Sequence, residues 1–196
     1  MTIMEGINYL IDRENYELQF QFSKFFMLLL ISFPMLLVQT AYEEVLFRGY
    51  MMQWLGRYMP YRIFPLLLTG ISFGVMHMMN PEVGAFGWQV MIDYISIGII
   101  LGLVTILSDS LELAIGLHFA NNLFLSLFVT FDDSVLQTDA VFRIKEMELS
   151  GTSQIYSIVL LLIFFFIVRQ KYPFKPVSYL WQYDSWKKNV LDEKAQ

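Results

Sequence analysis

The sequence predicts an all-α fold, a polytopic membrane bundle of about five transmembrane helices with a short interfacial C-terminal segment. Two observations lead to this fold class. Of the 196 residues, 56% are hydrophobic and only 16% carry a charged side chain, whereas about a quarter are charged in a soluble domain. The apolar residues also form runs long enough to cross about 30 Å of hydrocarbon. We expect a single membrane domain over residues 1–196.

Five segments have the length of a membrane span, and they cover roughly residues 22–40, 62–79, 88–107, 111–131 and 154–168. The first contains Pro34, which is expected to bend the helix because proline donates no backbone hydrogen bond. This helix is expected to continue through a charged stretch towards Arg57. The fifth segment is almost uniformly apolar, and we expect it to serve packing or anchoring.

The connections between the predicted spans are short except for residues 132–153. Residues 132–153 are polar and are expected to form a surface loop with a short helix. The tail over residues 172–196 combines aromatic side chains with lysines: Tyr179, Trp181, Tyr183, Trp186, Lys187 and Lys188. This composition suits the membrane interface. The N-terminus lacks the basic flank and cleavage site of a signal peptide, so we expect the first apolar segment to be retained.

An odd number of spans places the chain ends on opposite faces of the membrane. The face of the N-terminus then carries four basic side chains: Arg13, Lys24, Arg143 and Lys145. The other face carries eight: Arg57, Arg62, Arg169, Lys171, Lys175, Lys187, Lys188 and Lys194. Because cytoplasmic loops are the richer in lysine and arginine, we expect a cytoplasmic C-terminus. The compactness of the chain favours the cytoplasmic membrane of a prokaryote.

Composition also excludes several functions. The chain has no cysteine, which rules out disulfides, thiolate metal sites and a cysteine nucleophile. The net charge is −5 and no basic run is present, so we expect no nucleic-acid partner. The lipid bilayer is the expected environment of the protein.

Three charged residues interrupt the first apolar helix in the stretch EEVLFR: Glu43, Glu44 and Arg48. Charges inside a membrane are costly and usually mark function. Glu44 and Arg48 are four residues apart with the acid first, which is the favourable order for a helical ion pair. Glu43 points about 100° away around the helix and lacks such a local partner. Glu43 is therefore the carboxylate most in need of a function.

The only two histidines of the chain lie in predicted spans. His77 ends the stretch FGVMH and shares a helix face with Phe73, and a single histidine near a helix end is more often structural than catalytic. If the first helical hairpin turns near Pro60, however, Glu43 and His77 are equally far from the turn in sequence. Two antiparallel helices would then hold them at the same depth, and we expect them to form a pair.

The fourth span opens with ELAIGLHFANN. His118 and Asn122 are four residues apart and project from one helix face. Gly116 is expected to allow the close approach of another helix. Asn121 lies on a different face and is expected to form a helix–helix hydrogen bond. This span starts on the same side of the membrane as the hairpin turn near Pro60. We therefore expect His118 to approach Glu43.

One free carboxylate, two histidines and an asparagine allow two hydrolytic mechanisms. In the first, Glu43 is the general base for a water that His77 also holds. His118 and Asn122 would donate hydrogen bonds to the developing oxyanion. In the second, Glu43, His77 and His118 bind Zn²⁺, which activates the water instead. The HExxH spacing is absent, so no cofactor is expected and zinc stays an alternative. Serine and aspartyl mechanisms are excluded, since the chain has no GxSxG motif and no paired intramembrane aspartates.

Three stretches, in order, match the motifs of one membrane-protease family: EEVLFR fits EExxxR, FGVMH fits FxxxH and HFANN fits HxxxN. Over roughly residues 39–127 the chain resembles the CPBP family of CAAX prenyl proteases and bacteriocin-processing proteins, also called the Abi family. The resemblance implies an intramembrane, glutamate-dependent endopeptidase acting on a peptide or membrane protein. It implies these roles: Glu43 as base, His77 as holder of the water, His118 and Asn122 as oxyanion site, and Glu44, Arg48 and Phe73 as supporting residues.

Two other function classes stay open at this point. The chain could be a non-catalytic membrane scaffold or immunity-type protein that retains the motifs for packing. It could also be a small proton-coupled carrier that uses Glu43 and His77 as a relay, although the sequence shows no inverted repeat of the kind that transporters use. We expect the hydrolase.

Overall fold

The computed structural model describes residues 9–10, 12–146 and 151–182. Its long elements are helices, and the chain order is α2 (Phe22–Glu44), η2 (Val45–Met51), α3 (Met52–Gly56), α4 (Ile63–Met76), α5 (Pro81–Phe86), α6 (Val90–Ser108), α7 (Leu111–Phe128) and α8 (Gly151–Lys171). Single 3₁₀ turns are η1 (Arg13–Asn15), η3 (Gly87–Gln89) and η4 (Val177–Trp181). Three short strands complete the fold: β1 (Tyr16–Leu18), β2 (Val129–Thr130) and β3 (Phe142–Ile144).

Four helical segments of the described chain are long and apolar enough to cross a membrane: Phe22–Gly56, Pro81–Ser108, Leu111–Phe128 and Gln154–Lys171. The other predicted span is the shorter apolar helix α4, which ends at Met76. The helix stops early because Asn80, which precedes Pro81, is extended (φ −67°, ψ 145°), and a proline ring disfavours helical geometry in the residue before it. The predicted polytopic helical bundle is confirmed, with one helix shorter than expected.

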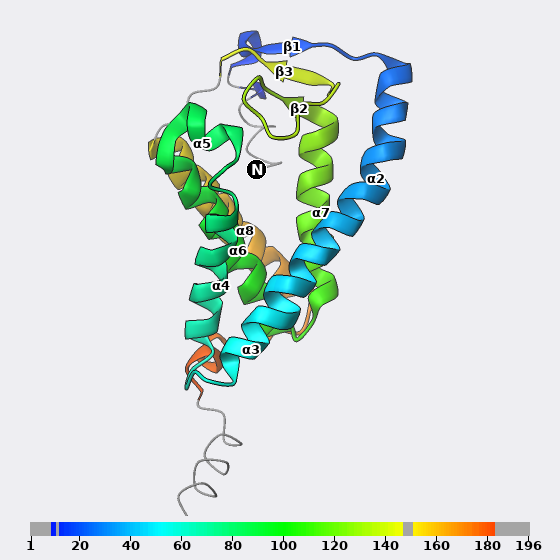
Figure 1. The fold of residues 1–196 in the computed structure, drawn as a ribbon. Helices are drawn as coiled ribbons and strands as arrows, with labels where there is room; N and C mark the ends of the chain where they lie inside the picture. Colours follow the sequence, from blue (N-terminus) through cyan, green and yellow to red (C-terminus); the bar gives the residue numbers. More distant parts are fainter. Residues whose placement is uncertain (1–8, 11, 147–150, 183–196) are drawn as a thin grey trace, which may run out of the picture.

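The helices form two groups (Figure 1). Helix α2 lies beside α7, and α4 packs against α6, which in turn contacts α8. The two groups come together towards α3, while the β-strands lie at the opposite end of the bundle. Strand β1 and turn η4 thus occupy opposite ends, as expected for a chain that crosses the membrane an odd number of times.

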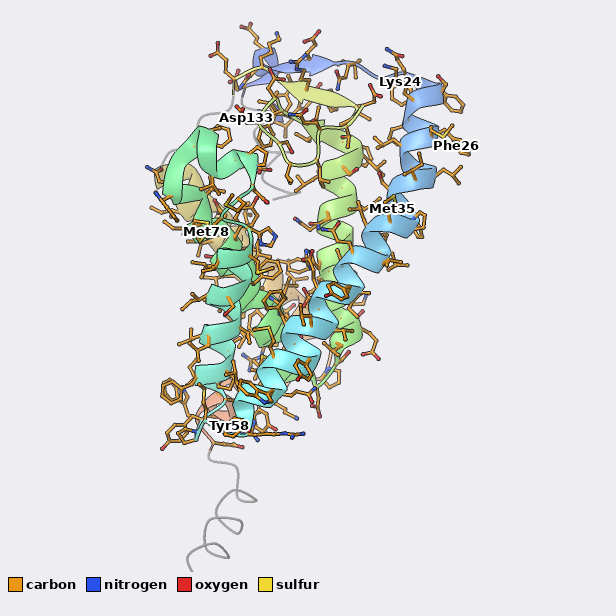
Figure 2. The ribbon with its side chains drawn as sticks, in the orientation of Figure 1. Lys24, Phe26, Met35, Tyr58, Met78 and Asp133 are labelled. Carbon is orange, nitrogen blue, oxygen red and sulfur yellow. The ribbon has the colours of Figure 1, made fainter. Side chains whose placement is uncertain are left out.

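The first helix runs as predicted from Phe22 to Gly56, but its middle is not α-helical. It changes direction near Met35, next to the predicted bend at Pro34 (Figure 2). Element η2 is a π-helix, and the backbone N–H of Met52 accordingly donates to the carbonyl of Phe47, five residues earlier. π-helical turns inside α-helices occur often at functional sites. Here the π-helix directly follows the two glutamates of EEVLFR.

The expectation of a short helix within residues 132–153 is wrong for the described part of that segment. Strand β3 instead pairs with β1 in antiparallel register, Tyr16 opposite Ile144, and with β2 in parallel register. The pairing of β1 with β3 joins segments more than a hundred residues apart, so no local pattern in the sequence could indicate it. The small sheet closes one end of the bundle.

The tail packs back onto the bundle as far as it is described. Leu180 is buried in a core cluster with Leu66, Leu107 and Phe165, and the Arg62 guanidinium lies 4.0 Å from the centre of the Tyr179 ring. Trp181 is 61% exposed, which agrees with an interfacial position. The other tail residues predicted to lie at the membrane interface are outside the described residues: Tyr183, Trp186, Lys187 and Lys188.

Candidate functional site

The predicted ion pair between Glu44 and Arg48 is present and completely buried. Arg48 Nη1 lies 2.8 Å from Glu44 Oε1, and neither side chain is exposed. Arg48 Nη2 donates a second hydrogen bond to the Gly98 carbonyl of α6 at 2.7 Å. Buried charges are tolerated only when they are paired and hydrogen-bonded. The pair therefore neutralises itself and ties the π-helix to α6.

Aromatic rings surround the arginine. The Arg48 guanidinium lies 4.8 Å from the centre of the Phe73 ring, a cation–π distance. Phe47 contacts Phe73 edge to face at 5.4 Å between ring centres. Phe73 is 2% exposed, and its ring also contacts the rings of His77 and His118. The FxxxH phenylalanine is thus the packing centre between both histidines and the arginine.

Glu44 has a second partner that the sequence did not suggest. His118 Nδ1 lies 2.8 Å from Glu44 Oε1, the oxygen that also accepts from Arg48. A carboxylate paired with arginine is ionised and can only accept, so Nδ1 carries the proton of this hydrogen bond. The ring of His118 is thereby fixed with Nε2 directed at Glu43, whose Oε2 lies 3.8 Å away.

Glu43 differs from Glu44 in its exposure and in its partners. Its side chain is 20% exposed, and Gln39 Nε2 donates to Oε1 at 3.1 Å. The other oxygen, Oε2, is buried and accepts no hydrogen bond from the part of the chain that the structure describes. At 3.8 Å, His118 Nε2 is too far away for a direct hydrogen bond, although close enough for one water to contact both atoms.

The predicted direct pair of Glu43 and His77 is wrong, since the two side chains make no ion pair or hydrogen bond in the described structure. His77 follows the last residue of α4, with φ −95° and ψ 2°. Its Nδ1 lies 2.7 Å from the Phe73 carbonyl. A carbonyl can only accept, so Nδ1 carries the proton and Nε2 is the acceptor nitrogen. His118 is the histidine that faces Glu43.

His77 also contacts residues of its own turn and of α6. Its ring stacks on Tyr94, with 4.4 Å between ring centres and 24° between planes. Asn80 Nδ2 donates to Tyr94 Oη at 3.0 Å. The stack and this hydrogen bond place His77, Asn80 and Tyr94 in one cluster at the end of α4.

The asparagines of HFANN interact with each other. Asn121 Nδ2 donates to Asn122 Oδ1 at 3.2 Å, so the helix–helix hydrogen bond expected of Asn121 is instead made to its neighbour. The Asn122 oxygen is thereby occupied, and its Nδ2 group remains to donate. The close helix contact expected at Gly116 is also wrong, because a Cβ there would meet no atom within 4 Å.

The candidate zinc ligands are not brought together. Among the residues that the structure describes, no group of three histidine, aspartate or glutamate side chains is arranged to hold a metal ion. His77 is held by Phe73 and Tyr94, whereas His118 lies between the two glutamates. In this arrangement the residues do not fit the zinc mechanism.

Four residues of the site were not predicted from the sequence: Gln39, Asn80, Tyr94 and Gly98. The spacing of Gln39, four residues before Glu43, could have indicated its hydrogen bond. Tyr94 and Gly98 reach the site from α6, and nothing local in the sequence marks them.

Comparisons with known proteins place the chain in a family. A family model described as "Type II CAAX prenyl endopeptidase Rce1-like" matches residues 25–124, a range that includes every site residue named above. The "Uncharacterized protein YyaK" of Bacillus subtilis (strain 168) is 35% identical over 136 residues, which are 69% of this chain and 46% of that protein. The chain thus spans about half the length of this curated relative. No solved structure matches the chain.

Proposed function

The chain belongs to the Rce1-like family of type II CAAX prenyl endopeptidases, and on this premise we propose that it is a membrane-embedded endopeptidase. It hydrolyses a peptide bond of a peptide or membrane-protein substrate with a water activated by Glu43. The family supports the reaction class, and the position of Glu43 beside His118 Nε2 supports the role of Glu43.

One observation carries the proposal. Glu43 Oε2 is buried without a hydrogen bond from a described residue, and it lies 3.8 Å from a histidine nitrogen that Glu44 holds in a fixed direction. A water at this position can donate a proton to Oε2. A partly buried carboxylate with one oxygen oriented by Gln39 and the other open suits a general base.

The proposed reaction follows from these contacts. Glu43 takes one proton from the water, and the water oxygen attacks the peptide carbonyl carbon. When the tetrahedral intermediate collapses, the C–N bond breaks and the proton passes from Glu43 to the leaving amine. His77 Nε2 is a second acceptor that holds the water in place.

The developing oxyanion needs donors. The Asn122 Nδ2 group is the donating end of a side chain whose oxygen is already occupied by Asn121. We assign the second donor role to His118, which lies between Glu43 and Glu44. Oriented donors of this kind contribute strongly to catalysis in a site shielded from water. No step of this proposal requires a metal ion or another cofactor.

The location of the protein is part of the proposal. The four apolar spans make it an integral membrane protein, and the excess of basic residues on the C-terminal face supports a cytoplasmic C-terminus. We assign it to the cytoplasmic membrane of a prokaryote. The family's name points to prenylated peptides as one substrate class to test.

The experiment uses the full chain, purified in detergent and returned to lipid vesicles, with a peptide library in prenylated and unprenylated forms. The wild type is expected to cleave a subset of the peptides. Glu43→Gln, His77→Ala and His118→Ala should each lower kcat/KM by at least about 100-fold, the usual range for acid–base groups, at unchanged melting temperature. Glu17→Gln, an exposed glutamate on β1, is the matched control.

Two outcomes would contradict the proposal. Full activity of Glu43→Gln would remove the general base from the mechanism. A well-folded wild type that cleaves no peptide or membrane-protein substrate would favour the non-catalytic scaffold.

A further inference from the structure

We propose that Tyr94 is a positioning residue for His77, and that Asn80 holds Tyr94 in the orientation this requires. The inference rests on the proposed function, because it gives His77 the task of holding the water. It assigns a role to two residues that lie outside the three sequence motifs.

His77 occupies a position that its own helix holds weakly. It follows the last residue of α4, and the neighbouring Met76 and Met79 are 69% and 93% exposed. Figure 2 places Met78 at the end of α4, on the outside of the bundle. These exposed methionines therefore contribute little to fixing the imidazole ring.

Three contacts then determine how the ring lies, and the first is the tilted Phe73 ring at 4.6 Å between ring centres. The hydrogen bond from Nδ1 to the Phe73 carbonyl fixes one edge. The Tyr94 ring stacks on the face of the imidazole, with 4.4 Å between centres and 24° between planes. An edge contact alone would let the ring rotate about its hydrogen bond, whereas an edge and a face together fix the plane. Only with a fixed plane does Nε2 keep one direction.

Tyr94 is itself oriented from the turn that carries His77. Asn80 Nδ2 donates to Tyr94 Oη, and the backbone N–H of Asn80 donates to the His77 carbonyl. One four-residue turn therefore holds Tyr94 at two places, at the ring through His77 and at the hydroxyl through Asn80. The arrangement is a closed link between the end of α4 and α6.

The link predicts different effects for two substitutions of Tyr94. Tyr94→Leu removes the stacked ring, and we expect kcat to fall at least about 10-fold while KM changes less than about two-fold. Tyr94→Phe retains the ring and loses only the hydroxyl, so it should restore kcat to within about three-fold of the wild type. If Tyr94 were needed only for folding, Tyr94→Leu would not lower kcat while leaving KM nearly unchanged. Tyr94→Phe would then restore the melting temperature together with kcat.

A second readout does not depend on activity. The chain has only two histidines, so the imidazole C–H region of an NMR spectrum in detergent contains two sets of signals, assigned with His77→Gln and His118→Gln. A ring stacked on His77 shifts its signals upfield. We expect Tyr94→Leu to remove most of this shift and to leave the His118 signals in place. Tyr94→Phe and Asn80→Ala both remove the hydrogen bond between Asn80 and Tyr94, so each should reduce the His77 shift only in part.

The control is Tyr156→Leu, which removes an exposed tyrosine of α8 and should change neither readout. Unchanged kcat in a folded Tyr94→Leu protein, or unmoved His77 signals, would overturn the inference. If the wild type cleaves nothing, the proposed function fails and the catalytic purpose of the link fails with it. The NMR comparison distinguishes that case, because it reports the hold of Tyr94 on His77 without substrate.

Discussion

Glu44 and His118 form a buried hydrogen bond of 2.8 Å between α2 and α7, although the two residues are 74 positions apart in the sequence. The oxygen that accepts this bond also accepts from Arg48. A carboxylate that orients a histidine through Nδ1 and leaves Nε2 to face the reacting groups is a common catalytic arrangement. Glu44 is therefore more than the counter-ion of Arg48.

Replacing the carboxylate of Glu44 with an amide tests its hold on His118. In Glu44→Gln a neutral amide oxygen takes the place of the carboxylate oxygen that accepts from both Arg48 and His118 Nδ1, so both hydrogen bonds become weaker. We expect kcat to fall by about 10-fold or more, with His118 signals shifted in the NMR spectrum. Normal kcat in this variant would show that His118 needs no charged partner at Nδ1.

The buried ion pair makes a different prediction for stability. Glu44→Leu alone leaves Arg48 buried without its carboxylate, which should lower stability by about 3–5 kcal/mol. Glu44→Leu combined with Arg48→Met removes both charges and should recover most of the melting temperature in detergent. The double variant should stay inactive, since His118 still lacks its partner. A double variant less stable than the single one would contradict this reasoning.

The two neighbouring asparagines provide a matched pair for the oxyanion site. Asn122→Ala removes the proposed donor, and we expect kcat to fall by about 100- to 1,000-fold with little change in KM. Asn121→Ala removes only the hydrogen bond to the Asn122 oxygen and should cost less than about 10-fold. Initial rates over a range of substrate concentrations separate the cases. Equal losses in both variants would argue against a specific donor at Asn122.

The contact between α4 and α6 depends on glycine. A Cβ at Gly98 would lie 2.8 Å from the Gly70 carbonyl oxygen and 3.1 Å from Phe73 Cβ. Gly98→Val should therefore push the helices apart, lower stability by about 1–3 kcal/mol and displace the carbonyl that binds Arg48. Gly116→Ala is the control, since a Cβ there meets nothing within 4 Å and alanine favours helix. Thermal unfolding in detergent measures both.

Removal of metal ions separates the two hydrolytic mechanisms. Since the three candidate ligands are not grouped among the described residues, we expect full cleavage after treatment with a strong chelator, with no stoichiometric zinc by elemental analysis. Glu43→Gln supplies the inactive reference. Activity that disappears on chelation and returns on addition of Zn²⁺ would establish the zinc mechanism instead.

Much of the fold could be predicted because its signals are local. Hydropathy located the spans, and the i, i+4 spacing identified the Glu44–Arg48 pair. The sheet could not be predicted, because strands β1 and β3 are short and are more than a hundred residues apart in the sequence. The π-helix was missed for a similar reason, since hydropathy does not distinguish its geometry from that of an α-helix.

The candidate site likewise combines features that could be predicted from local signals with contacts that could not. Depth arithmetic brought Glu43, His77 and His118 towards one level, yet it paired Glu43 with the wrong histidine. Distance along a helix axis fixes depth, whereas facing depends on rotation about the axis. Because α4 ends at Met76, His77 leaves the helix and turns its Nδ1 to the Phe73 carbonyl.

The sequence alone determined the membrane bundle, the order of the spans and the residues that carry ionisable groups into them. These properties follow from apolar length and from the fixed geometry of one helix. Only the tertiary structure decided that His118 faces Glu43, that Glu44 orients His118, and that Tyr94 stacks on His77. Contacts between helices depend on their tilt and rotation, which result from packing along the whole interface and not from any one motif.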